Sequence, residues 1–438
     1  MLKAGIAVRD VLPKEHLLML GYPEPKDRYD TGAHDTLYAS AYVLENNGER
    51  VALISVDLCY ISKVRAAEIR KLIETQTGIP ANHISLSFTH THSGPVTDSN
   101  PFEASDNMKE LYPDYVDYVR DRIAEAVKDA ADHLFDAQIG FGKGTCGKES
   151  GMGGNRHDPD GPQDPDVTVM AIRDLTGDLR GCLVHYAMHP TVLQADNNQL
   201  SADFPCYIRE YLHNLHPNAV CAYLMGHSGN QSTRFFRKAQ DFDECKRLGY
   251  LLATEAERVI AGMKFEGDPK LAVDVEGAYP PFKTLPTYDE AVKNAQKAKD
   301  EYDRLVAEGA PYATCRTAEC TMIGTNSMMH TAYAYEHGGL ENLRATQLPV
   351  EVQIIRIGDA AMVGFSCEAF VEIGLTIKSH SPFRYTFLNF LTNGAFISYF
   401  CTDEAFSEFS YEALGSQLAP GSAQALIDAA DRAFQAVK

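Results

Sequence analysis

The segment that most constrains this chain is FTHTHSGP at residues 88–95, which follows the run ISLS at residues 84–87. The run is typical of a buried strand, and the Gly-Pro pair is typical of a sharp turn. Because side chains alternate along a strand, His90 and His92 share one side at its end. Neutral imidazole is a preferred zinc ligand, so the pair indicates part of a metal site. Two hydrogen-bonded histidines beside a surface turn fit the same local sequence.

A second predicted strand also ends on a histidine, at residues 183–189 with the sequence LVHYAMH. Pro190 keeps His189 extended, because the residue before a proline avoids the helical region. His185 lies inside the strand and fits a histidine of the core. His189 is therefore the candidate that repeats the geometry of the first site.

A third predicted strand, at residues 219–225, runs into the turn GHSGNQSTR at residues 226–234. Ser228 invites comparison with the nucleophile elbow of hydrolases. That motif requires G-x-S-x-G, and Asn230 stands where its second glycine would be. We therefore reject the elbow, and Ser232 is the other serine that the turn presents.

Two later candidates lie near predicted element ends. Residues 366–377 are predicted to form a helix with Glu368 at its N-terminus, where the helix dipole keeps a carboxylate ionised. Such a carboxylate suits a metal ligand and equally suits a plain helix start. Residues 385–391 and 396–400 resemble a hairpin that places Tyr399 beside the end of a sheet.

The polar, glycine-rich loop at residues 151–162 presents one arginine, Arg156. Long loops on a large domain often carry function. The local sequence allows either a residue that orients a substrate or a surface salt-bridge partner.

The order strand, helix, strand over residues 50–89 predicts an α/β fold with mixed, largely parallel sheets flanked by helices. Ligands are then expected at the carboxyl ends of the strands. No repeat or low-complexity linker divides the chain, so we expect one large domain over residues 1–438. A charged helix opened by a capping box at residues 287–290 belongs to a helical insertion predicted at about residues 266–345.

Composition limits the classes of partner. The net charge of −20 repels nucleic acids and anionic membrane surfaces. No run approaches the ~18 to 20 apolar residues of a spanning helix. The N-terminus lacks the apolar core of a signal peptide, so we expect a cytoplasmic protein. No CxxC pair suggests a cysteine metal site, and Cys315 and Cys320 invite a bridge only if the protein is exported.

The motifs and their order resemble the catalytic domain of the neutral (non-lysosomal) ceramidase family. They are THTHSGP at residues 89–95, GNR at 154–156, HPT at 189–191 and GNQS at 229–232. The resemblance implies one zinc ion per chain, held by His90, His189, Glu368 and Tyr399. It further implies a catalytic Ser232 supported by His92, Arg156 and Tyr411. The chain is expected to lack the family's C-terminal immunoglobulin-like domain.

The resemblance implies a zinc-dependent hydrolase of a linear amide, acting on a small N-acyl or lipid-like substrate. Zinc activates a water molecule, and Ser232 assists or attacks. Two alternatives remain: an esterase or lactonase using the same site, and a non-catalytic zinc-containing binding or sensor protein. A nucleotide-binding or phosphoryl-transfer enzyme is disfavoured, because neither glycine-rich stretch has P-loop or dinucleotide spacing.

Overall fold

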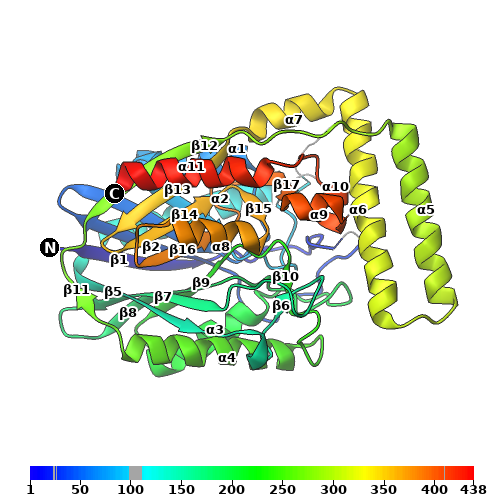
Figure 1. The fold of residues 1–438 in the computed structure, drawn as a ribbon. Coiled ribbons are helices and arrows are strands. Elements are labelled where there is room, and N and C mark those ends of the chain that lie inside the picture. The colour runs from blue at the N-terminus through cyan, green and yellow to red at the C-terminus, as the bar shows by residue number, and fades with distance from the viewer. Residues whose placement is uncertain (23–24, 26, 98–110, 409) are drawn as a thin grey trace.

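The largest element of the fold is a nine-stranded sheet (Figure 1). The computed structural model describes residues 1–22, 25, 27–97, 111–408 and 410–438. Eight strands follow the order β4-β3-β2-β1-β5-β7-β8-β9, and the short β11 (Phe265–Glu266) pairs with β5. The eight are β1 (Lys3–Asp10), β2 (Tyr38–Asn46), β3 (Glu49–Val56), β4 (Ile84–Phe88), β5 (Phe135–Thr145), β7 (Asp166–Asp174), β8 (Leu179–Tyr186) and β9 (Val220–Met225).

The mixed α/β class is confirmed, but the prediction of largely parallel sheets is wrong. Within the described strands of this sheet, only β3–β4 and β8–β9 run parallel. Each of these pairs is joined through a helix, α1 (Lys63–Thr77) or α3 (Phe204–Leu215), as a parallel crossover requires. The other pairs are antiparallel, and β2 meets β3 through a tight turn at Asn47 and Gly48, both with positive φ.

A smaller sheet packs against one face of the large one. It has the order β12-β13-β14-β16. Alternation along β3 explains the layering: Val51 and Leu53 face the small sheet, whereas Ala52, Ile54 and Val56 face helices. The strands are β12 (Leu271–Ala278), β13 (Val350–Ile357), β14 (Ala360–Phe365) and β16 (Tyr385–Asn389).

Helices cover the outer face of each sheet, which gives four layers. The outer face of the large sheet is covered by α1, α2 (Pro113–Asp132), α3 and α4 (Phe242–Ala261). The outer face of the small sheet is covered by α8 (Val371–His380) and α11 (Ser422–Val437). The apolar core therefore lies in three interfaces: one between the two β-sheets and one under each helical layer.

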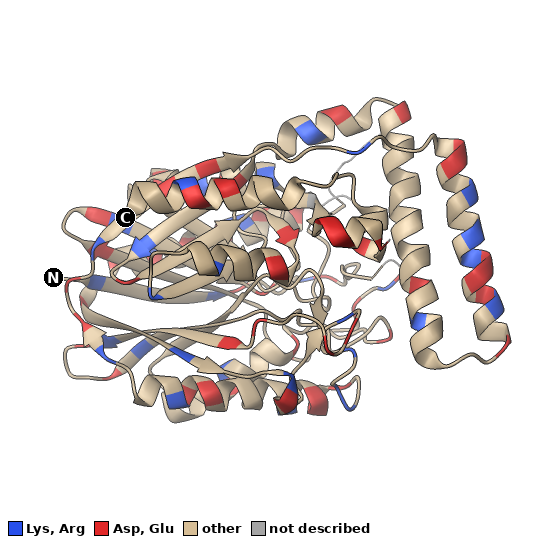
Figure 2. Ribbon diagram, in the orientation of Figure 1, with Lys and Arg blue, Asp and Glu red and all other residues tan. Residues whose placement is uncertain are grey.

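Three helices project beyond these layers, at the right of Figure 1: α5 (Tyr288–Ala307), α6 (Tyr312–Glu336) and α7 (Gly339–Gln347). The capping box at the start of α5 is confirmed by the paired Thr287 and Glu290 hydrogen bonds. Charged residues of both signs run along α5 (Figure 2), as on a solvated helix. The predicted insertion at 266–345 is thus helical from residue 288, whereas its first part supplies strand β12. 

Short elements complete the fold around the end of the sheets. They are β6 (Gly154–Asn155), β10 (Gln231–Ser232), β15 (Cys367–Ala369), β17 (Phe396–Phe400), α9 (Asp403–Ser407) and α10 (Tyr411–Gly415), with short 3-10 turns at Ala81–His83 and Lys148–Ser150. Cys315 and Cys320 are free thiols. Among the described residues, no helix is both long enough and apolar enough to cross a lipid bilayer.

Candidate active site

His90 is positioned by a strained turn just after β4. Its φ of 63° lies in the left-handed region, which is uncommon for a residue other than glycine. The Nδ1–H of His90 donates to the Cys59 carbonyl oxygen at 2.9 Å. A carbonyl only accepts, so this bond fixes the tautomer and leaves Nε2 with a free lone pair. Burial lowers the pKa of His90 to about 4, so the ring is neutral at pH 7.

His189 follows β8 and is held in the same way. Its Nδ1–H donates to the Gln231 carbonyl oxygen at 3.1 Å. Its Nε2 atom is buried and has no hydrogen-bond partner among the described residues. Hydrogen bonding of one ring nitrogen to a backbone carbonyl is the usual arrangement behind a metal-bound histidine.

Glu368 faces both of these nitrogens. Its Oε1 lies 3.7 Å from His90 Nε2, and its Oε2 lies 3.7 Å from His189 Nε2. The ligand atoms of the three residues all lie within 4.8 Å of one another. Two ligand atoms bound tetrahedrally to one zinc ion are about 3.4 Å apart, from bond lengths of roughly 2.1 Å. The three side chains therefore fit a single zinc ion.

The orphaned atoms support the same fit. Glu368 Oε2, like His189 Nε2, is buried without a hydrogen-bond partner in the described part of the chain. Although burial alone would raise the pKa of Glu368, the neighbouring His90, His189 and Tyr399 lower it to about 2. The carboxylate is therefore ionised while the His90 imidazole is neutral, which is the protonation state that metal binding requires.

Glu368 reaches this position on a strand and not on a helix. It lies in the middle of β15, and α8 begins only at Val371, so the predicted helix start at Glu368 is wrong. The predicted hairpin is also wrong, because β16 belongs to the small sheet whereas β17 pairs with β15 in parallel. In that pair Glu368 lies directly opposite Tyr399.

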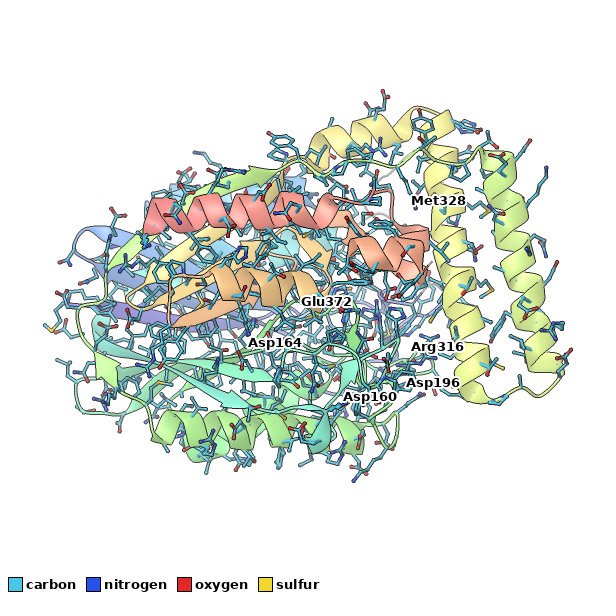
Figure 3. All side chains as sticks on the ribbon, in the orientation of Figure 1. Asp160, Asp164, Asp196, Arg316, Met328 and Glu372 are labelled. Atoms are coloured by element: carbon cyan, nitrogen blue, oxygen red, sulfur yellow. The ribbon has the colours of Figure 1, made fainter. Side chains whose placement is uncertain are left out.

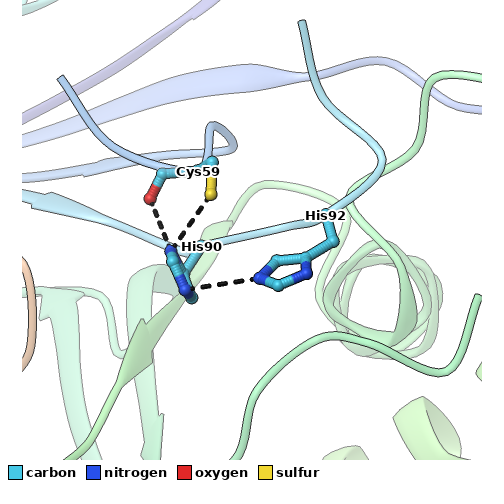
Figure 4. A group of neighbouring side chains, drawn as sticks. All are labelled: Cys59, His90 and His92. Atoms are coloured by element: carbon cyan, nitrogen blue, oxygen red, sulfur yellow. Dashed lines mark hydrogen bonds between the residues drawn. The ribbon is translucent and has the colours of Figure 1, made fainter. Parts of the chain in front are cut away.

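A second group that could hold a metal shares His90 with the first. Cys59 Sγ lies 3.2 Å from His90 Nδ1, and His92 Nε2 lies 3.4 Å from His90 Nε2 (Figure 4). A cysteine binds a metal ion well only as a thiolate. Burial raises the pKa of the Cys59 thiol well above its usual value, which disfavours the thiolate. Since His90 Nδ1 is bonded to the backbone, Nε2 is the nitrogen that His90 presents to Glu368.

His92 is fixed by close packing against the segment before β2. A Cβ atom on Gly21 would lie 2.4 Å from His92 Cγ, and Gly21 has a φ of +115°, so only glycine fits there. Tyr22 meets the His92 ring edge-on, with 5.0 Å between ring centres. Burial lowers the pKa of His92 well below its usual value, so the ring next to His90 is a neutral imidazole.

Arg156 is buried in a pair with Glu412. Arg156 Nε and Nη2 lie 2.9 and 2.8 Å from Glu412 Oε1, and the Glu412 side chain is fully buried. The guanidinium also lies over the Tyr411 ring, 4.9 Å from its centre, and over Tyr399 at 5.7 Å. A surface salt bridge is thereby ruled out. Glu412 was not found from the sequence, because its partner lies 256 residues away and no local motif marks it.

Ser232 lies on β10, the two-residue strand that pairs with β6. It lines the same cavity as the histidines. The preceding residue, Gln231, supplies the carbonyl that accepts from His189. The Ser232 hydroxyl accepts from the backbone N–H of Arg234 at 3.2 Å. In the same turn Asn230 accepts from the backbone N–H of Val371 at 3.0 Å, which ties the serine turn to the start of α8.

The histidines, Glu368, Arg156 and Ser232 line one cavity of about 940 Å³. Helices α6, α9 and α10 contribute residues to its lining. The cavity also contains arginines that no sequence motif marks. The eight residues predicted from the sequence all line it: His90, His92, Arg156, His189, Ser232, Glu368, Tyr399 and Tyr411.

Fold and site together define a mixed α/β protein with a candidate metal centre at the end of its sheets. Residues 3–212 match the family described as neutral/alkaline non-lysosomal ceramidase, N-terminal. The resemblance to that family is confirmed.

Curated relatives extend the match. The neutral ceramidase of Pseudomonas aeruginosa is 23% identical over 274 residues, which cover 56% of this chain and 40% of the relative. Neutral ceramidase A of Dictyostelium discoideum is 26% identical over 229 residues, which cover 49% of this chain and 32% of the relative. The matched part thus spans less than half the length of these relatives.

Solved structures show the same fold. The crystal structure of neutral ceramidase from Pseudomonas aeruginosa aligns with a TM-score of 0.73 at 19% identity, covering 100% of this chain and 75% of that one. A structure titled ceramidase complexed with C2 aligns with the same score at 18% identity, covering 99% and 74%. The likeness in fold therefore extends well beyond residues 3–212.

Proposed function

We propose that this chain is a zinc-dependent hydrolase that cleaves the amide bond of a linear N-acyl compound, with one zinc ion per chain. The observation that carries the proposal is the convergence of the candidate ligand atoms of His90, His189 and Glu368 in one cavity with Ser232. The relatives named neutral ceramidase support an amide substrate.

The residues that would hold the ion are His90, His189 and Glu368, with the Tyr399 hydroxyl as the fourth candidate. A bound zinc ion supplies a Lewis acid that polarises the amide carbonyl and makes water acidic enough to react near neutral pH. The chain supplies the rest. The Nδ1–H of each histidine donates to a backbone carbonyl, which leaves Nε2 as the nitrogen that faces Glu368.

Three groups act on the substrate. His92 is a neutral imidazole at the edge of the centre, so its Nε2 can hold or pass on a proton. The Ser232 hydroxyl either attacks the carbonyl or moves a proton to the leaving nitrogen. Tyr411, packed against the immobile Arg156 guanidinium, can donate a hydrogen bond to the oxygen on which negative charge develops.

The test compares an amide, an ester and a lactone with the same octanoyl chain on the zinc-loaded protein. We expect turnover of the amide, and a loss of about 100-fold or more in kcat for Ser232→Ala with zinc content unchanged. Ser228→Ala is the matched control, because Ser228 is buried in the same turn and its hydroxyl has no partner among the described groups.

Two results would contradict the proposal. Cleavage of the ester or lactone but not the amide would make the chain an esterase or lactonase. Full zinc content with no turnover of any substrate would make it a zinc-containing binding protein.

A further inference from the structure

Arginines form one wall of the cavity beyond the metal centre. Arg234 and Arg237 follow Ser232 on the same segment, and Arg316 comes from α6. Arg234 reaches α6 directly, because its Nη2 donates to the carbonyl of Ala313 on the helix that carries Arg316. Figure 3 labels Arg316 on the side of α6 that faces the sheets. We call Arg234, Arg237 and Arg316 the arginine wall.

The arginines that line the cavity differ in whether a carboxylate balances them. Arg156 is paired with the buried Glu412, at 2.8 Å. Arg316 is paired with Glu319, one turn away on α6, at 2.7 Å. Among the residues that the structure describes, no carboxylate lies within 4.0 Å of Arg234 or Arg237. Two positive charges on the cavity wall therefore have no carboxylate partner in the described part of the chain.

Neutral groups hold these two guanidinium groups in place. Arg234 donates from Nη1 to the Arg156 carbonyl and from Nη2 to the Ala313 carbonyl, both at 3.3 Å. Arg237 donates from Nη1 to the Thr191 carbonyl at 3.3 Å and to Thr233 Oγ1 at 3.4 Å. These bonds orient the arginines without cancelling their charge.

The charge on Arg234 is also partly desolvated. Its Nε is buried and has no hydrogen-bond partner in the described part of the chain. Burial, together with the cations of Arg316 and Arg156, lowers the pKa of Arg234, although an arginine remains charged at pH 7. An anion bound here would relieve the repulsion and satisfy the remaining donors.

Acidic residues line the cavity from other elements. Glu372 lies in the first turn of α8 and accepts from Asn230 at 2.8 Å, whereas Glu404 and Glu408 belong to α9 and the residue after it. Figure 3 labels Glu372 away from Arg316. The cavity thus has an arginine wall and, on different elements, an acidic side. The chain has a net charge of −20. Two arginines without a paired carboxylate among the described residues therefore favour an anionic ligand.

We propose that the substrate carries an anionic group, a carboxylate or a sulfonate, which Arg234 and Arg237 bind while the amide lies at the metal centre. This inference rests on the proposed function and specifies its substrate class. Guanidinium groups match planar carboxylates and sulfonates through paired N–H donors. The substrates so defined are N-acyl amino acids and their sulfonate analogues, as opposed to neutral N-acyl amino alcohols.

Hydrolysis of three octanoyl amides tests the proposal. N-octanoylglycine carries a carboxylate, N-octanoyltaurine a sulfonate, and N-octanoylethanolamine is neutral and of similar size. We expect kcat/KM for at least one anionic substrate to exceed that of the neutral one by about tenfold or more, since a hydrogen bond to a charged group contributes that much. The preferred anion identifies the group that is bound.

Variants connect the preference to the arginine wall. Arg234→Gln and Arg237→Gln should each lower the ratio of anionic to neutral kcat/KM by about tenfold. Arg258→Gln is the matched control, because Arg258 is an exposed arginine on α4, paired with Glu255, outside the cavity lining. Equal rates for charged and neutral amides, or a ratio unchanged in both variants, would overturn the proposal.

A binding measurement separates this inference from the proposed function. Calorimetric titration of chelator-treated protein with the same three compounds needs no turnover. Tighter binding of an anionic compound, lost in Arg234→Gln, supports the arginine wall even if no amide is cleaved and the proposed function fails. Hydrolysis with equal binding of all three compounds would instead refute the arginine wall and leave the hydrolase intact.

Discussion

The two halves of the candidate site differ in how the chain builds them. His90 and His189 each follow a strand of the large sheet and lie within the segment that matches the ceramidase family. Glu368 and Tyr399 lie outside that segment, on the two short strands β15 and β17. The histidines are therefore set by local strand ends, whereas the later pair is set by which strands meet.

This difference shows where the precision of the site originates. Each histidine has its own anchor, a backbone carbonyl bonded to Nδ1. Glu368 is instead aligned by the parallel register that places it opposite Tyr399, and its carboxylate bridges the two Nε2 atoms at 3.7 Å. His90 and His189 supply oriented nitrogen atoms, whereas Glu368 supplies a negative charge.

The largest expected effect is a loss of bound zinc when a ligand from either half of the site is removed. His189→Ala should lose stoichiometric zinc, because a neutral nitrogen donor with no other partner is removed. Glu368→Gln should also lower zinc affinity, by at least about 10- to 100-fold, because the ionised ligand becomes neutral. Metal analysis and competition with a chelator measure both.

His380→Ala serves as the control, since His380 is exposed and paired with Asp431 far from the cavity. If Glu368→Gln bound zinc as tightly as the unmodified protein, the later half would not contribute a ligand.

The next effect concerns Glu412, which joins the halves by pairing with Arg156 across 256 residues. Glu412→Gln leaves a buried guanidinium without its countercharge. We expect the free energy of unfolding to fall by about 3 kcal/mol or more. The KM should change less than kcat if the paired Arg156 acts by holding Tyr411, over whose ring its guanidinium lies.

Denaturant unfolding and steady-state kinetics test this, with Glu412→Asp as the conservative variant that restores the charge. Unfolding and kinetics that are the same in Glu412→Gln and Glu412→Asp would show that the charge of Glu412 has no role.

The smallest effect is a pH dependence of opposite sign at two groups, one inside the segment of residues 3–212 and one outside it. Burial raises the pKa of Asp203, at the start of α3, from 3.8 to about 6. Between these values the unfolded chain loses its proton first, so the free energy of unfolding falls as pH rises, by up to about 3 kcal/mol. Burial lowers the pKa of Lys283 from 10.5 to about 8. There the folded chain loses its proton first, so stability rises between pH 8 and 10.5.

Denaturant unfolding across both ranges checks the signs. Asp203→Asn should remove the slope below pH 6, and Lys283→Met should remove the slope above pH 8. A slope that persists in its own variant would assign the titration to another group.

Much of the fold and site could be predicted where the signal is local. The strand ends at His90 and His189 follow from periodicity and from Pro190. The mixed class follows from the β3-α1-β4 unit, but extending that unit to the whole sheet was wrong, because tight turns such as Asn47-Gly48 make most pairs antiparallel.

Long-range pairing could not be predicted from the residues alone. The position of Glu368 on β15 depends on its pairing with β17, which overrides the local preference for a helix start. Arg234 and Arg237 belong to no recognisable sequence motif. They become candidate anion-binding residues because the fold leaves them without carboxylate neighbours in the described chain. Glu412 was missed for the same reason.

The central claim is that nitrogen and oxygen ligands from both halves hold one zinc ion. X-ray absorption at the zinc edge of the purified protein tests it most directly. The account predicts one zinc per chain with only nitrogen and oxygen neighbours at about 2.0–2.2 Å. A sulfur neighbour at about 2.3 Å would place the ion between Cys59, His90 and His92 and would contradict the account.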